Sequence, residues 1–136
     1  MKTFGAICLL ATLATAVSAF DGSDVKDLVL NGICIKCDLN GVDLTAKDFQ
    51  DSDLRDSSMV GANLQKVNLT GANLTGANLT GANLTQARLT GANLTEVGMV
   101  GAGLVGADLT DANMNRANLT GANLSASLLT KTNLRQ

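Results

Sequence analysis

Two cysteines three positions apart, Cys34 and Cys37, are the residues whose type and spacing most clearly suggest chemistry. A Cys-x-x-Cys pair either closes a short structural disulfide or takes part in thiol–disulfide exchange. The redox interpretation expects a strand–helix–strand context, which this sequence lacks. The sequence therefore favours a structural disulfide that locks an N-terminal segment to the chain that follows.

Carboxylates follow the cysteines at a spacing of five residues: Asp38, Asp43, Asp48 and Asp53. On a chain that turns a corner every five residues they would point in different directions, so we interpret them as a solvated rim rather than a calcium site. The chain has no histidine for acid–base catalysis or zinc binding, and its few serines have no partnered base. We therefore expect no enzyme activity, no metal site and no cofactor.

The N-terminus is typical of an export signal. Lys2 precedes an apolar run that ends in small residues, and Val17-Ser18-Ala19 fits a cleavage site after Ala19. Residues 1–19 are thus predicted to be a signal peptide, and no later segment is apolar enough to cross a membrane. The triplet Ser18–Phe20 also resembles the signal-to-transit junction of proteins sent to algal plastids, but the acidic stretch after it is unlike a transit peptide.

The rest of the chain is organised by a five-residue period. Each five-residue repeat, called a word below, is numbered from its central position, i. The centres fall at every fifth residue from 39 to 134. Of these 20 positions sixteen are Leu, three Met and one Phe. Alanine is commonest at i−2, Asn or Asp at i−1, Thr at i+1 and Gly at i+2. The words run from Cys37 to Gln136 without an insertion or deletion.

Neither an α-helix nor a flat strand suits this period. On a helix the centres would spiral around the axis, and on a strand they would alternate between faces. A chain that turns a corner once per word can direct every centre inward, and its windings can stack into a solenoid. The period alone leaves the number of sides open.

The tandem A(N/D)LXX words resemble the pentapeptide-repeat family. The resemblance implies an all-β fold, a right-handed four-sided β-helix in which the residues at i and i−2 fill the core. With four words per coil, the 20 words of residues 37–136 give about five coils and a rod of roughly 24 Å. It also implies that Leu84 faces inward and Thr85 outward.

The two ends of the repeat region differ. Residues 20–36 are predicted to cap the first coil with a short helix over Asp24–Leu30, which Ser23 starts and Asn31-Gly32 stops. No such segment follows the last words, where Leu128 replaces the usual Asn or Asp near Leu134. We expect either a homodimer through this end, in agreement with the family resemblance, or a monomer with a frayed last coil.

One coil has an unusual outer surface. Residues 97–107 contain no charge and no asparagine, and Gly98, Val100, Gly103 and Val105 should face outward. This weakly apolar patch is a candidate interaction surface, with drift in a tolerant repeat as the alternative. Seven N-x-[ST] sequons arise from the repeated NLT, and whether they carry glycans stays open.

The leading hypothesis for function is a non-catalytic scaffold that binds a protein partner in an extracytosolic compartment. An ice- or crystal-binding solenoid that uses the column Thr70, Thr90, Thr110 and Thr130 is the alternative. A DNA mimic that protects topoisomerases is disfavoured, because residues 57–136 hold three acids and five bases. The net charge of −2 predicts neither a nucleic acid nor a membrane partner.

Overall fold

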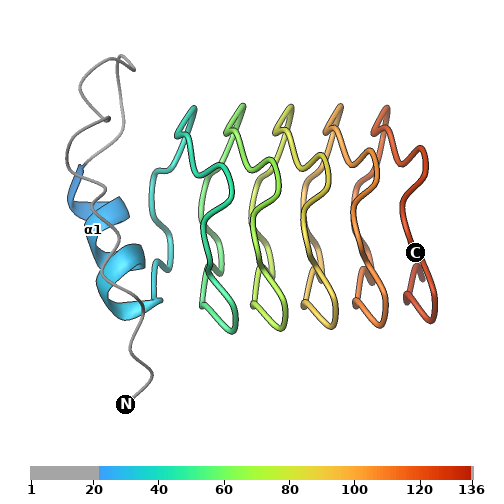
Figure 1. Cartoon of the computed structure of the whole chain (residues 1–136), viewed down its shortest axis with the longest axis horizontal. Helices are drawn as coiled ribbons and strands as arrows, with labels where there is room; N and C mark the ends of the chain where they lie inside the picture. Colours follow the sequence, from blue (N-terminus) through green and yellow to red (C-terminus); the bar gives the residue numbers. More distant parts are fainter. Residues whose placement is uncertain (1–21, 136) are drawn as a thin grey trace.

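The structure, a computed structural model, describes residues 22–135. One helix, α1 (Gly22–Asn31), is followed by a chain that winds repeatedly around a common axis (Figure 1). α1 lies at one end of the stack and the C-terminus at the other. The signal peptide expected over residues 1–19 lies outside the described residues. Within residues 22–135, no helix is long and apolar enough to span a lipid bilayer.

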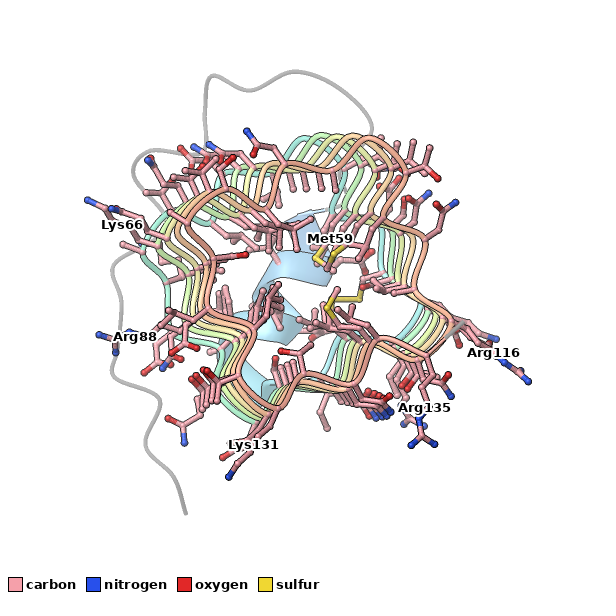
Figure 2. The ribbon with its side chains drawn as sticks, turned by 90° about the vertical axis from the view of Figure 1, so that its right-hand side faces the viewer. Met59, Lys66, Arg88, Arg116, Lys131 and Arg135 are labelled. Carbon is pink, nitrogen blue, oxygen red and sulfur yellow. A yellow bond between two sulfur atoms is a disulfide. The ribbon has the colours of Figure 1, made fainter. Side chains whose placement is uncertain are left out.

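Successive windings are joined by parallel β-bridges between residues twenty positions apart. Asn83, for example, bridges Asn63 in the preceding winding and Gly103 in the next. Each bridge involves one residue per winding, so the walls contain isolated bridges rather than extended strands. One winding therefore takes up four five-residue words, and the ribbon seen along the axis has a roughly square outline (Figure 2).

Backbone hydrogen bonds form a regular ladder along each wall. Leu84 N donates to Gly103 O at 2.7 Å, and Gln86 N donates to Val105 O at 2.8 Å. In the other direction, Asn83 N donates to Ala62 O at 2.9 Å. The wall residues of the inner windings thus find partners for their backbone polar groups in the windings above and below.

A tight turn forms the corner after each centre. Ala87 N donates to Leu84 O at 3.0 Å, and Gln86 has a φ of 58°. A positive φ at the third residue of such a turn, but not at the second, is the type II pattern, which glycine adopts without steric cost. The turn geometry explains why glycine is the commonest residue at i+2.

The core is made of the centres and the small residues two positions before them. Leu84 and Ala82 are both 0% exposed. Because burial of a leucine side chain contributes about 1.5–3 kcal/mol, the stacked leucines dominate the stability of the rod. Lys47, the charged residue at an i−2 position, is only half-buried.

The N-terminal helix is present but begins earlier than expected. α1 starts at Gly22, so Ser23 lies inside the helix and is not its N-cap. Serine is only mildly unfavourable inside a helix, so Ser23 can occupy the first turn without breaking it. α1 also runs one residue past the expected end at Leu30, to Asn31, and Gly32 then stops it: Gly32 has a φ of 65°, and its N–H donates to Leu28 O at 2.9 Å, which is the αL helix stop.

α1 covers the first winding through apolar and polar contacts. Val25 and Leu28 are buried against the core. The Asp24 side chain accepts a hydrogen bond from Asp38 N through Oδ2 at 2.9 Å. The helix therefore covers apolar side chains that would otherwise meet solvent at this end.

The C-terminal winding is more open. Leu119 and Leu124 are only partly buried, and the last two centres, Leu129 and Leu134, are 39% and 46% exposed. Within residues 22–135, no segment packs over this end as α1 packs over the other. The inner columns therefore end in an apolar surface.

Candidate interaction surfaces

The outer face of the rod is organised by hydrogen bonds between the residues at i−1 and i+1. Asn73 Oδ1 accepts from Thr75 N at 3.2 Å and from Thr75 Oγ1 at 2.7 Å. The same pair of bonds occurs at Asn68–Thr70, Asn78–Thr80, Asn93–Thr95 and Asn118–Thr120. These bonds give the repeated NLT a structural role independent of glycosylation.

The same bonds bear on the threonine column considered for ice binding. Thr70 Oγ1 donates to Asn68 Oδ1 at 2.7 Å, and Thr90 Oγ1 donates to Asp108 Oδ2 at 3.1 Å. Both threonines are half-buried. These hydroxyl groups are already hydrogen-bonded within the protein. The geometry therefore offers little support for a column of threonine hydroxyl groups that binds an ice or crystal surface.

The candidate patch in residues 97–107 lies on the outer surface. Val100 is 37% exposed, and Val105 is half-buried. Gly98 and Gly103 occupy bridge positions, where neighbouring windings carry asparagine. Because the two glycines lack side chains, the wall is smooth on both sides of Val100.

A glycine-lined corner borders this patch. Five turn positions spaced twenty apart are all glycine: Gly41, Gly61, Gly81, Gly101 and Gly121. Each of the first four has open space where a Cβ would stand. Val60 precedes this corner as Val100 does, and it is 38% exposed. Val60 was not predicted from the sequence, and the twenty-residue winding places it in one column with Thr80 and Val100.

The early carboxylates lie on four different walls, as their bridges to different columns require. A hydrogen bond from the Thr45 side chain lowers the pKa of Asp43, and one from Arg55 lowers the pKa of Asp53. Within residues 22–135, no three Asp, Glu, Cys or His side chains gather in a way that could hold a metal ion. These acids accept hydrogen bonds within their own five-residue repeats, and Asp48 also accepts one from Asn68 of the next winding.

Cys34 and Cys37 lie at the junction of α1 and the first winding. Both side chains are buried, and their sulfur atoms stand at disulfide distance, 2.13 Å. Cys34 Sγ is also 3.2 Å from the carbonyl oxygen of Asp24 in α1. Because both cysteines follow α1 in the chain, a bond between them would close a short loop at the start of the first winding and would not link α1 covalently to the rod, contrary to the expectation from the sequence.

The end residues singled out in the sequence lie together on the last winding. Leu128 is 56% exposed and Leu134 is 46% exposed. Leu128 occupies a bridge position opposite Asp108, whereas Leu134 is a centre of the core column. Leu129 and Leu134 are core centres that the open end leaves exposed, and Leu128 lies beside this end on the outer face of the wall.

The repeats and their winding define a class of protein. The family model for pentapeptide repeats (8 copies) matches residues 33–71, 72–111 and 99–136. These ranges cover most of the chain, which therefore belongs to the pentapeptide-repeat family. No curated protein matches the sequence.

Two solved structures place the chain among its relatives. It is similar to Rfr23, a pentapeptide repeat protein from the cyanobacterium Cyanothece 51142, with 29% identity and a TM-score of 0.81 over 83% of this chain and 90% of that chain. It is also similar to a pentapeptide repeat protein from the Arabidopsis thaliana thylakoid lumen, with 33% identity and a TM-score of 0.50 over 73% of this chain and 66% of that chain. Both neighbours agree with a β-helical solenoid.

Proposed function

We propose that this protein is a non-catalytic scaffold that binds a protein partner in an extracytosolic compartment. The observation that carries the proposal is the exposed valine column beside the glycine corner, formed by Val60 and Val100. Valine side chains supply apolar area, and glycines let a partner's backbone come close to the wall. The ladder of backbone bonds holds this surface rigid, which lowers the entropic cost of binding.

The scaffold in this proposal is a right-handed, four-sided β-helix of about five coils. Support comes from the bridges between residues twenty apart and from the outline of the ribbon in Figure 2. Such a rod presents four long walls, and each wall can carry its own surface. The glycine corner is the one place where the same small residue recurs in every winding from Gly41 to Gly121.

The compartment is proposed from the N-terminal sequence and from the cysteines. Residues 1–19 have the pattern of a secretory signal peptide, and the Cys34–Cys37 pair suits an oxidising environment. The plastid or thylakoid lumen of an alga is the alternative destination, supported by the Ser18–Phe20 junction and by the likeness to a thylakoid lumen protein. Localisation of the tagged full chain, with and without residues 1–19, distinguishes these destinations.

Partner capture tests the proposed surface. The protein is immobilised as wild type, as Val100→Asp/Val105→Asp, and as the control Thr70→Asp/Thr75→Asp, which adds the same charges to the two corners on the other side of the rod. We expect a discrete set of proteins to be retained by wild type and control but reduced about tenfold by the valine double variant. Equal retention by both double variants would rule out this surface.

Self-association through the C-terminal end is a second proposal, supported by the exposed Leu128, Leu129 and Leu134. The proposed occupant of this apolar surface is a second copy of the chain. Analytical ultracentrifugation of wild type and Leu128→Asp tests it: we expect a dimer that the substitution converts to a monomer. A wild type that stays monomeric across the concentration series would refute it.

A further inference from the structure

A pocket of about 440 Å³ lies on a corner next to the glycine corner. It is lined by residues of three successive windings: Ala46, Lys47, Asp48, Lys66, Asn68, Gln86 and Arg88. Three of these side chains are cationic in a protein whose net charge is −2. Figure 2 shows Lys66 and Arg88 projecting from the same side of the outline, away from Arg116 and Arg135.

The three cations occupy positions where the repeat normally carries other residues. Lys47 is the only charged residue at i−2, and Arg88 is the only basic residue at i−1. Lys66 lies at an i+2 corner position with a φ of 58°, where glycine is the commonest residue. Two departures from the repeat, Lys47 and Arg88, therefore meet Lys66 in one pocket.

In the part of the chain that the structure describes, no short ion pair holds the cations, although Asp43 and Asp108 lie close enough to Lys47 and Arg88 for charge attraction. Among residues 22–135, none of Lys47, Lys66 and Arg88 makes an ion pair. Asp48, the carboxylate in the pocket, accepts hydrogen bonds through Oδ1 from Asn68 Nδ2 at 2.8 Å and from Gln50 N at 3.2 Å. Arg88 also faces Asp108 of the next winding, whose Oδ2 accepts from Thr90 Oγ1.

We propose that this pocket binds a phosphate- or sulfate-sized oxyanion, either free or as the head of a small monoester. Two ammonium groups and one guanidinium offer charge-assisted hydrogen bonds, and the amides of Asn68 and Gln86 offer further donors. The flanking carboxylates Asp43, Asp48 and Asp108 oppose an extended polyanion, because its further charges would lie beside them. The pocket thus suits one compact anionic group.

The test is an NMR titration of the ¹⁵N-labelled full chain at constant ionic strength, with inorganic phosphate, sulfate, O-phosphoserine and chloride as probes. We expect saturable shifts of the amides of Lys66, Asn68 and Arg88 with the oxyanions and none with chloride. Tighter binding of phosphoserine than of phosphate identifies a monoester as the ligand, and the reverse identifies the free ion. Shifts that do not saturate, or that chloride reproduces, would overturn the proposal.

Two matched double variants test whether phosphate binds in this pocket or is attracted only by the overall charge of the protein. Lys66→Gln/Arg88→Gln should weaken phosphate binding about tenfold. Lys131→Gln/Arg135→Gln removes the same charge from other parts of the outline in Figure 2 and should change binding less than about twofold. Equal weakening by the two double variants would show that net charge alone attracts the anion, and thermal melts confirm that each variant stays folded.

Discussion

Leu84 and Thr85 are adjacent in the chain but lie on opposite sides of the same wall. Leu84 is 0% exposed, whereas Thr85 reaches the outer surface and its N–H donates to Asn83 Oδ1 at 3.1 Å. The boundary between core and surface therefore passes between two consecutive residues. These two residues therefore give the sharpest test of the register, that is, of which positions in each five-residue repeat face the core and which face solvent.

Leu84→Asp is expected to unfold the rod, because it places an unpaired charge in an apolar column and removes a buried leucine. The loss should exceed about 4 kcal/mol. Thr85→Asp should change the free energy of unfolding by less than about 0.5 kcal/mol. Urea denaturation of both variants measures this, and equal losses would contradict the register.

The asparagine–threonine bonds of the outer face should contribute measurably to stability. Asn73→Ala removes the acceptor of two hydrogen bonds from Thr75, and we expect a loss of about 1 kcal/mol. The Asn73→Ala/Thr75→Ala double variant should lose less than the sum of the single losses, since the two residues share these bonds. Additive losses would mean that the pair is not coupled.

The turn after each centre requires a positive φ, which should lower the stability of the protein when the residue there is not glycine. Gly81→Ala meets no neighbouring atom at its Cβ, so its effect should come only from the positive φ of 66°. We expect a loss of about 1 kcal/mol, measured by urea denaturation. Gln86→Gly, at a turn of the same geometry, is the control, and it should be nearly neutral or slightly stabilising. A stabilising effect of Gly81→Ala would contradict the turn assignment.

The Cys34–Cys37 pair should stabilise the N-terminal end locally. Thiol quantitation of the isolated protein should find this pair oxidised, and Cys34→Ala/Cys37→Ala should cost about 2 kcal/mol. Amide exchange should accelerate in α1 and the first winding, while the windings beyond residue 60 keep their protection. Free thiols at both positions would show that the pair is reduced and would favour a redox role instead.

Acid should weaken the rod. Hydrogen bonds from the Thr45 side chain, from Arg55 and from the Thr110 side chain hold the pKa values of Asp43, Asp53 and Asp108 below the ordinary 3.8. Because the unfolded chain then binds protons at a higher pH than the folded one, stability is full above about pH 5 and falls as the pH drops through the lowered pKa values. With no histidine in the chain, Tm should be flat from about pH 5 to 8. A Tm that rises on acidification would contradict these shifts.

Much of the fold follows from the sequence because one apolar residue recurs at every fifth position, and only a chain that turns at every word can bury them all. The burial of Leu84 was predicted on this basis, and the helix stop at Gly32 was predicted separately from the Asn31-Gly32 stop signal. The start of α1 was not, because first-turn residues such as Ser23 resemble capping residues. Nor was the turn conformation at positions such as Gln86, since a side chain there tolerates positive φ at a modest cost.

The candidate surfaces were harder to predict, because they depend on which residues lie in one column. Val60 and Val100 are forty positions apart and align only when one winding takes twenty residues. The same holds for Lys47, Lys66 and Arg88, which look like isolated departures in the sequence. The five-residue period alone leaves this alignment open; the family resemblance implied it, but it was applied only to the core columns and to the threonine column.

The alignment of residues twenty apart is therefore the central claim, and inter-residue nuclear Overhauser effects measure it directly. Backbone contacts should connect Asn83 with both Asn63 and Gly103, and the same pattern should recur along every wall. Sequential helical contacts across residues 60–130, or contacts at a spacing other than twenty, would contradict the account.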